Sequence, residues 1–163
     1  MIPEIESKPA MVPLPEGPKT LAGLRTNIRA GIAYLRGWNA EMGCVAWDDL
    51  MEDLATLEMS RAQVRQWMHN RITLDDGPQV TVDFVRSVFH EQQRRIEAEI
   101  CKLLCDAGSG TIEREVQAYR DAAFDAEALF LEADFRPFLA SSSPAAHLGP
   151  KERRQQLFGT GAA

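Results

Sequence analysis

Apolar residues recur every three or four positions over most of the chain, as the buried face of an amphipathic helix requires. The first such stretch begins after Thr20, a residue type suited to an N-cap, and ends at Gly43. We therefore expect a long first helix. Its apolar face is formed by Leu24, Ile28, Ile32 and Leu35.

A second helix is expected from about Trp47 to Met59, capped by Asp48 or Asp49. Ser60 and Gln63 have the spacing of a capping box, in which each side chain satisfies the other residue's backbone N–H. This spacing predicts that a third, separate helix opens at Ser60. Its buried stripe is Val64, Trp67 and Met68.

Two longer helices follow. Thr81 is expected to cap one that runs to about Leu104, and Thr111 one that runs to about Ala133. The inward-facing positions of the first are Phe84, Val85, Val88, Phe89, Ile96, Ile100, Leu103 and Leu104, and those of the second are Val116, Tyr119, Ala123, Leu129 and Phe130.

No segment has the alternating pattern of a strand, so the predicted fold class is all-α, a bundle of about five helices. Residues 1–19 contain five prolines and are expected to form an extended leader. Residues 20–140 form the helical domain, and residues 141–163, rich in Ser, Ala and Gly, are expected to form a flexible tail.

Composition narrows the classes of function. Of the 163 residues, 45% are apolar, which is enough to form a core. The chain is shorter than the roughly 250 residues that a (β/α)₈ barrel needs. The net charge of −6 argues against binding to nucleic acid or to an anionic membrane. No apolar run is long enough to span a membrane, and we expect no signal peptide.

The cysteines and methionines carry no clear chemistry. Three cysteines without an export signal indicate reduced thiols in the cytoplasm. Cys101 and Cys105, at helical spacing, are expected to be buried on a helix face, and Cys44 is expected to be a buried structural thiol. The histidines are too scattered for a metal motif. The methionines expected to fill the core are Met42, Met51, Met59 and Met68.

The densest polar group is Asp48, Asp49, Glu52 and Asp53. On the helix expected there, Asp53 lies at the border of the apolar stripe, where partial burial suits a general base. The alternative is a solvated helix face whose acidic residues complement the helix dipole. The residue pattern alone favours the solvated face.

A specific resemblance changes this balance. The run Leu50–Thr56, which reads Leu-Met-Glu-Asp-Leu-Ala-Thr, together with Gly43–Val45 before it and Ser60–Val64 after it, resembles the C-terminal domain of malate synthase, the A-type form. The resemblance covers roughly residues 13–148. Further matching segments are 15–18, 23–29, 66–67, 74–77 and 134–139.

The resemblance implies that a helical plug covers the mouth of a (β/α)₈ barrel in which acetyl-CoA condenses with glyoxylate to give malate. Asp53 would be the catalytic base that removes a proton from the acetyl methyl group. Met51 and Glu52 would line the entry for acetyl-CoA. An arginine and Mg²⁺ held by the barrel would stabilise the oxyanion, so no cofactor is expected in this chain itself.

We therefore expect this chain to need a malate synthase barrel as partner, in trans, and to make no malate alone. The alternatives are a non-catalytic helical interaction module and a truncated gene remnant. Two departures from the family pattern motivate the module: Asp48 and Asp49 replace an aromatic residue and an asparagine, and Arg65 replaces a tryptophan. Arg65 is either a charge on the barrel-facing surface or an ordinary exposed residue.

Overall fold

The computed structural model describes residues 17–47 and 49–132, and the fold that they form is mostly helical. This confirms the predicted fold class. Several expected features lie outside the described residues: residues 1–16 of the expected leader, Asp48, the helix end expected at about Ala133, and the expected tail. The elements are α1 (Leu21–Asn39), β1 (Val45–Trp47), β2 (Leu50–Glu52), α2 (Leu54–His69), α3 (Val82–Leu103) and α4 (Ser109–Leu131).

The helix expected from Trp47 to Met59 is correct only from Leu54 onward, because Trp47 and Leu50–Glu52 belong to strands. The strands β1 and β2 form an antiparallel hairpin, in which Ala46 pairs with Met51 and Trp47 with Leu50. Asp49 has a positive φ of 64°, a left-handed conformation that no helix interior contains and that lets the chain reverse. The segment is too short to be a stable helix by itself, and packing of its side chains on the bundle decides its conformation.

The separate helix expected at Ser60 is also wrong. Ser60 is buried in the interior of α2, which is continuous from Leu54 to His69. The Gln63 side chain accepts a hydrogen bond from Asn27 Nδ2 of α1 at 2.7 Å instead of reaching back to Ser60. Two expected helices are therefore one, and the described residues hold four helices.

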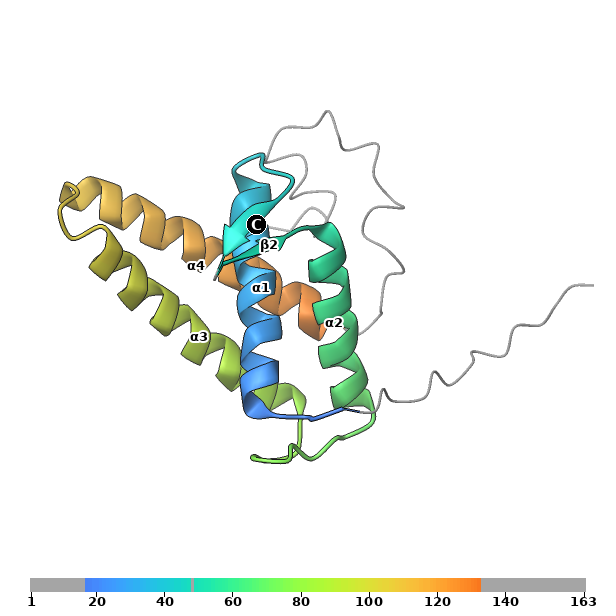
Figure 1. Cartoon of the computed structure of the whole chain (residues 1–163). Coiled ribbons are helices and arrows are strands. Elements are labelled where there is room, and N and C mark those ends of the chain that lie inside the picture. Colours follow the sequence, from blue (N-terminus) through green and yellow to red (C-terminus); the bar gives the residue numbers. More distant parts are fainter. Residues whose placement is uncertain (1–16, 48, 133–163) are drawn as a thin grey trace, which may run out of the picture.

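The core is built around α1, which contacts all three other helices (Figure 1). The four residues predicted as its apolar face are all at most 1% exposed. At Gly31 the helix comes close to Phe130 of α4, since a Cβ built there would lie 2.7 Å from the ring. Phe130 in turn meets Phe89 of α3 edge-on, with ring centroids 5.4 Å apart. Aromatic packing thus joins α1, α3 and α4.

The N-terminus of α1 is capped by its own residue and by a distant loop. Thr20 is the N-cap, as predicted, and its Oγ1 accepts from Gly23 N at 3.1 Å. Asp76 Oδ1 accepts from Leu21 N at 2.8 Å, and Asp75 Oδ2 accepts from Lys19 N at 2.8 Å. The loop after α2 therefore satisfies backbone N–H groups that a helix start leaves without partners.

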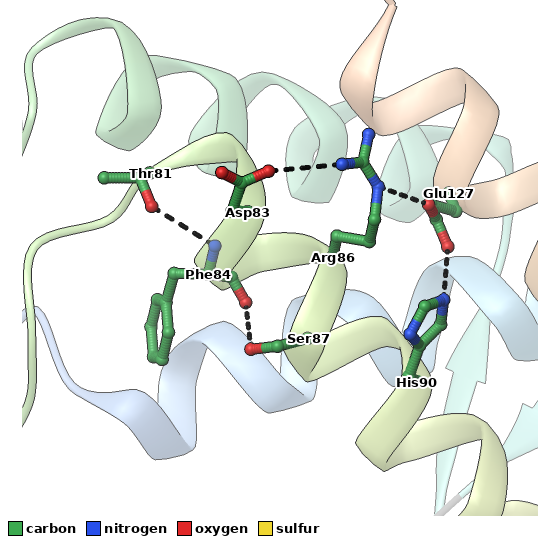
Figure 2. Close-up of polar contacts among 7 residues, drawn as sticks. All are labelled: Thr81, Asp83, Phe84, Arg86, Ser87, His90 and Glu127. Carbon is green, nitrogen blue, oxygen red and sulfur yellow. Dashed lines mark hydrogen bonds and ion pairs between the residues drawn. The ribbon is translucent and has the colours of Figure 1, made fainter.

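Helices α3 and α4 run side by side as a hairpin whose far end projects beyond α1 and α2 (Figure 1). Thr81 caps α3 as predicted, and its Oγ1 accepts from Phe84 N at 3.2 Å (Figure 2). Arg86 links the helices by pairing with Glu127 of α4 at 3.1 Å. The capping predicted for Thr111 is wrong, because α4 begins earlier, at Ser109, and has Gly108 as N-cap.

Several predicted core residues lie on the surface. All three cysteines are exposed, which contradicts the burial expected for Cys44, Cys101 and Cys105. The exposed fraction of Leu103 is 80% because it lies at the projecting end of α3, where no other element covers it. None of the helices that the structure describes has the length and apolar character needed to cross a membrane.

Candidate functional site at the start of α2

The β1–β2 hairpin places the Leu-Met-Glu-Asp run at the surface of the bundle. Leu50 and Met51 expose 61% and 65% of their area, whereas Glu52 is 7% exposed. Asp53 follows directly and is exposed. Of the three predicted site residues, the structure brings Met51 and Asp53 to the surface and turns Glu52 inward, where it pairs with Val45 in the register of the hairpin.

Asp53 is the N-cap of α2, a role that the sequence analysis missed because it placed the residue inside a helix. Its backbone is extended, and its Oδ1 accepts from Thr56 N at 3.0 Å and from Thr56 Oγ1 at 3.3 Å. Oδ2 accepts no hydrogen bond from the part of the chain that the structure describes. One oxygen is thus fixed by the helix and the other is available to a proton.

The start of a helix is also a position that suits an acceptor oxygen. The first backbone N–H groups of a helix lack intrahelical partners, and the helix dipole adds partial positive charge at that end. An ionised, oriented and exposed carboxylate is what a general base requires before substrate arrives. The N-cap role of Asp53 could have been predicted from the Asp-x-x-Thr spacing of Asp53 and Thr56, which suits an N-cap directly before an apolar stretch.

Several large apolar residues that are close to Asp53 in the sequence are exposed. Of the seven large apolar residues that are exposed in the described chain, four fall between positions 42 and 59: Met42, Leu50, Met51 and Met59. They were expected in the core, apart from Leu50, so that expectation is wrong. Leu50 and Met51 belong to β2, a strand of three residues that has too few neighbours to bury every side chain.

Tyr34 of α1 lies near the site and was not singled out from the sequence. Burial raises the pKa of Tyr34 to about 12, and the negative charges of Asp53 and Cys44 contribute to this rise, so both groups lie within electrostatic range of the phenol. Tyr34 is 1% exposed and therefore stays a neutral phenol behind the hairpin. Its position within the apolar stripe of α1 gives no sequence signal for this role.

Two departures from the family pattern have structural explanations. Asp49 lies in the turn between β1 and β2, where its φ is 64°. The left-handed backbone at Asp49 is one that asparagine, the residue of the family pattern, adopts readily. Arg65 is half-buried and donates through Nη1 to the backbone carbonyl of Glu132, so it ties α2 to the end of α4.

Metal-ligating residues do not gather at this site. Within residues 17–47 and 49–132, no group of three or more His, Cys, Asp or Glu side chains could hold a metal ion.

Comparisons with known proteins agree with the resemblance. Residues 18–143 match the family described as "Malate synthase, C-terminal". The chain is 46% identical over 92 residues to malate synthase of Myxococcus xanthus, which covers 56% of this chain and 17% of that protein. It is 39% identical over 85 residues to malate synthase A of Escherichia coli, covering 52% of this chain and 16% of that protein. A glyoxysomal malate synthase of Zea mays is 42% identical over 89 residues, which is 53% of this chain and 16% of that protein. The chain thus spans about a sixth of the length of these relatives.

Proposed function

The chain belongs to the malate synthase C-terminal domain family, and from this premise we propose that it supplies the catalytic base for condensing acetyl-CoA with glyoxylate. The base is Asp53. The observation that supports this most directly is the geometry of its carboxylate, which is exposed and held through Oδ1 by Thr56 while Oδ2 accepts no hydrogen bond from the described residues.

In the proposed reaction, Asp53 takes a proton from the methyl group of acetyl-CoA. The C–H electron pair moves into the enolate of the thioester. The enolate carbon then attacks the aldehyde carbon of glyoxylate, and hydrolysis of the resulting malyl thioester releases malate and CoA. The hydrogen bonds from Thr56 hold the carboxylate in one orientation before the proton is transferred.

The proposed partner is a malate synthase barrel, which would bind glyoxylate and stabilise the developing oxyanion. Oriented electrostatic stabilisation usually contributes more to such catalysis than any other effect, so the chain alone is expected to be inactive. Binding of acetyl-CoA and glyoxylate is therefore proposed only for the assembled complex. The exposed Leu50 and Met51 support docking at this face, because a barrel mouth would remove them from water.

The test is release of CoA thiol from acetyl-CoA, glyoxylate and Mg²⁺, measured with the chain alone and with a malate synthase barrel whose own C-terminal domain has been deleted. Activity is expected only in the mixture. Asp53→Asn keeps an N-cap of equal quality and removes the base, so it should abolish thiol release without unfolding α2.

Asp49→Asn is the matched control for this experiment. It removes a neighbouring exposed carboxylate by the same chemical change, at a position with left-handed φ that Asn tolerates. It should leave thiol release within about twofold of the unmodified mixture. A mixture that releases thiol equally well with Asp53→Asn would exclude Asp53 as the base.

A non-catalytic interaction module is the second candidate, and the same exposed apolar side chains favour it. It predicts that the chain binds a partner with no loss of binding in Asp53→Asn and no thiol release in any mixture. We also propose a cytoplasmic location, which the three free cysteines support because thiols persist in reducing compartments.

A further inference from the structure

The position of Asp53 depends on the β1–β2 hairpin, which is too small to be stable without packing against the helices. Its strands, Val45–Trp47 and Leu50–Glu52, have three residues each, and a two-stranded hairpin of this size is at best marginally stable in water. Asp53 follows β2 without an intervening residue. Whatever fixes the hairpin on the bundle therefore also fixes the direction from which the carboxylate meets its substrate.

One fixed point lies at the base of the hairpin. Gly37 of α1 has no Cβ, and Val45 fills the space that a Cβ would take, so the first residue of β1 lies directly against the helix. Val45 is the partner of Glu52 in the hairpin. This contact holds the base of the hairpin and leaves its turn end to be held by something else.

The second fixed point, near the turn end, is a stack of two aromatic rings with an arginine at each end. The guanidinium of Arg29 lies 5.4 Å from the ring centroid of Trp47. The Trp47 ring lies 5.8 Å from that of Tyr119, tilted by 45°, and the guanidinium of Arg36 lies 5.7 Å from the Tyr119 centroid. The order is Arg29, Trp47, Tyr119, Arg36, which we call the arginine–aromatic stack.

The stack joins three elements in a defined geometry. Arg29 and Arg36 are seven residues apart on α1, so they project from the same face about two turns from each other. Trp47 comes from β1 and Tyr119 from α4. A guanidinium over an aromatic face is attractive because the ring carries negative charge density there. Trp47 is the only member of the stack that belongs to the hairpin.

Ion pairs with α3 and α4 prevent the two arginines from turning away. Arg29 Nη1 and Nη2 donate to both oxygens of Glu99, at 3.3 and 2.8 Å. Arg36 Nη2 donates to both oxygens of Glu115, at 3.0 and 2.8 Å. Pairs of this kind, in which a guanidinium meets both carboxylate oxygens, restrict how its plane can turn, so the faces offered to the rings are set before the hairpin packs against them.

We propose that Trp47, held in the arginine–aromatic stack, is a positioning residue that sets the orientation of the β1–β2 hairpin and thereby of Asp53 for proton transfer. Only the last step of this inference, from the orientation of the hairpin to proton transfer by Asp53, rests on the proposed function. Trp47 does not touch the reacting atoms. It lies at the edge of the core, so its removal should loosen the hairpin while leaving the packing of α1, α3 and α4 in place.

The test pairs a measurement on the chain alone with one on the reconstituted mixture. The variants are Trp47→Ala and Tyr119→Ala, with Trp47→Phe as the conservative replacement that keeps a ring in the stack. Phe124→Ala is the matched control, because it truncates an aromatic side chain on the same helix as Tyr119, at a position that is 70% exposed and outside the stack.

On the chain alone, amide hydrogen exchange should quicken by roughly tenfold or more at residues 45–52 in Trp47→Ala and Tyr119→Ala, and stay unchanged in the interior of α1 and α3. Trp47→Phe and Phe124→Ala should exchange like the unmodified chain. Unchanged exchange of the hairpin in both alanine variants would overturn the inference, whatever the activity of the mixture.

In the mixture with the barrel, Trp47→Ala should lower kcat for CoA release by roughly 10²-fold, the scale of an approximately 1 Å misplacement, with little change in the KM for acetyl-CoA. Trp47→Phe should recover most of that loss. Faster exchange with an unchanged kcat would also overturn the inference. A mixture of unmodified proteins that releases no CoA would instead contradict the proposed function, and the exchange result would then decide by itself whether Trp47 holds the hairpin.

Discussion

The contact of α1 with α4 at Gly31 permits a sharp test of the packing. A Cβ built at Gly31 would lie 2.7 and 2.8 Å from two atoms of the Phe130 ring, whereas carbon atoms in contact prefer about 3.5–4.0 Å. One or both helices must therefore move by about 1 Å in Gly31→Ala. Phe130 cannot swing aside easily, since it is 1% exposed and held edge-on by Phe89.

The magnitude follows from two opposing effects. Overpacking of a core typically costs about 1–3 kcal/mol, and replacing a helical glycine by alanine gains up to about 1 kcal/mol. Gly31→Ala should therefore lower the free energy of unfolding by about 0–3 kcal/mol. Gly23→Ala, on the same helix, is the control, because its Cβ would meet only ordinary contacts at 3.4 and 3.8 Å. It should be neutral or stabilising.

Urea unfolding followed by far-UV circular dichroism measures the difference. The two variants should differ by about 1–3 kcal/mol, and with a slope of about 2 kcal/mol/M their midpoints should be separated by roughly 0.5–1.5 M. Phe130→Leu should cost less in the Gly31→Ala background than in the unmodified chain, since it relieves the collision. Equal midpoints for Gly31→Ala and Gly23→Ala would refute the argument that α1 and α4 meet at this glycine.

Three further predictions concern caps and titration. Asp53→Ala removes the N-cap of α2 and should cost about 0.5–2 kcal/mol, whereas Asp53→Asn should stay within about 0.5 kcal/mol of the unmodified chain in thermal unfolding. Asp76→Ala leaves the N–H of Leu21 without its partner and should cost about 1 kcal/mol by the same assay, with no effect on CoA release by the mixture. The pKa of Tyr34 is raised from 10.0 to about 12 by burial, so its contribution to stability is fully present below pH 10. That contribution is lost as the pH rises from 10 toward 12, because the unfolded chain releases the phenol proton at a lower pH than the folded chain does. That loss is about 3 kcal/mol, and Tyr34→Phe should remove this part of the alkaline decline in unfolding free energy while Tyr119 still titrates.

The stack and the cap hold the site in different ways. Asp53 is turned by its hydrogen bonds to Thr56, whereas the hairpin that delivers it is fixed by Trp47 and Val45. The first arrangement is local in sequence, and the second joins residues as far apart as Arg29 and Tyr119. A change at either place is expected to affect catalysis by a different route, through the direction of the carboxylate or through the order of the hairpin.

The sequence by itself determined the parts of the fold whose stabilising contacts are periodic or local. The apolar stripe of α1 and the caps Thr20 and Thr81 were predicted correctly, because a long amphipathic helix and its first turn carry their own signals. The Leu50–Thr56 run likewise identified the family that the comparison of residues 18–143 then showed.

Tertiary structure alone decided the region between α1 and α2. Helical spacing of apolar residues from Trp47 to Met59 suggested a helix, yet Trp47 packs on Tyr119 of α4, a contact that no local pattern reveals. The same is true of exposure, since Met51, Met59 and Cys101 have apolar side chains that none of the described elements covers. A three-residue strand has too few contacts of its own to fix its conformation, so the surface against which it packs determines it, and with it the place of Asp53.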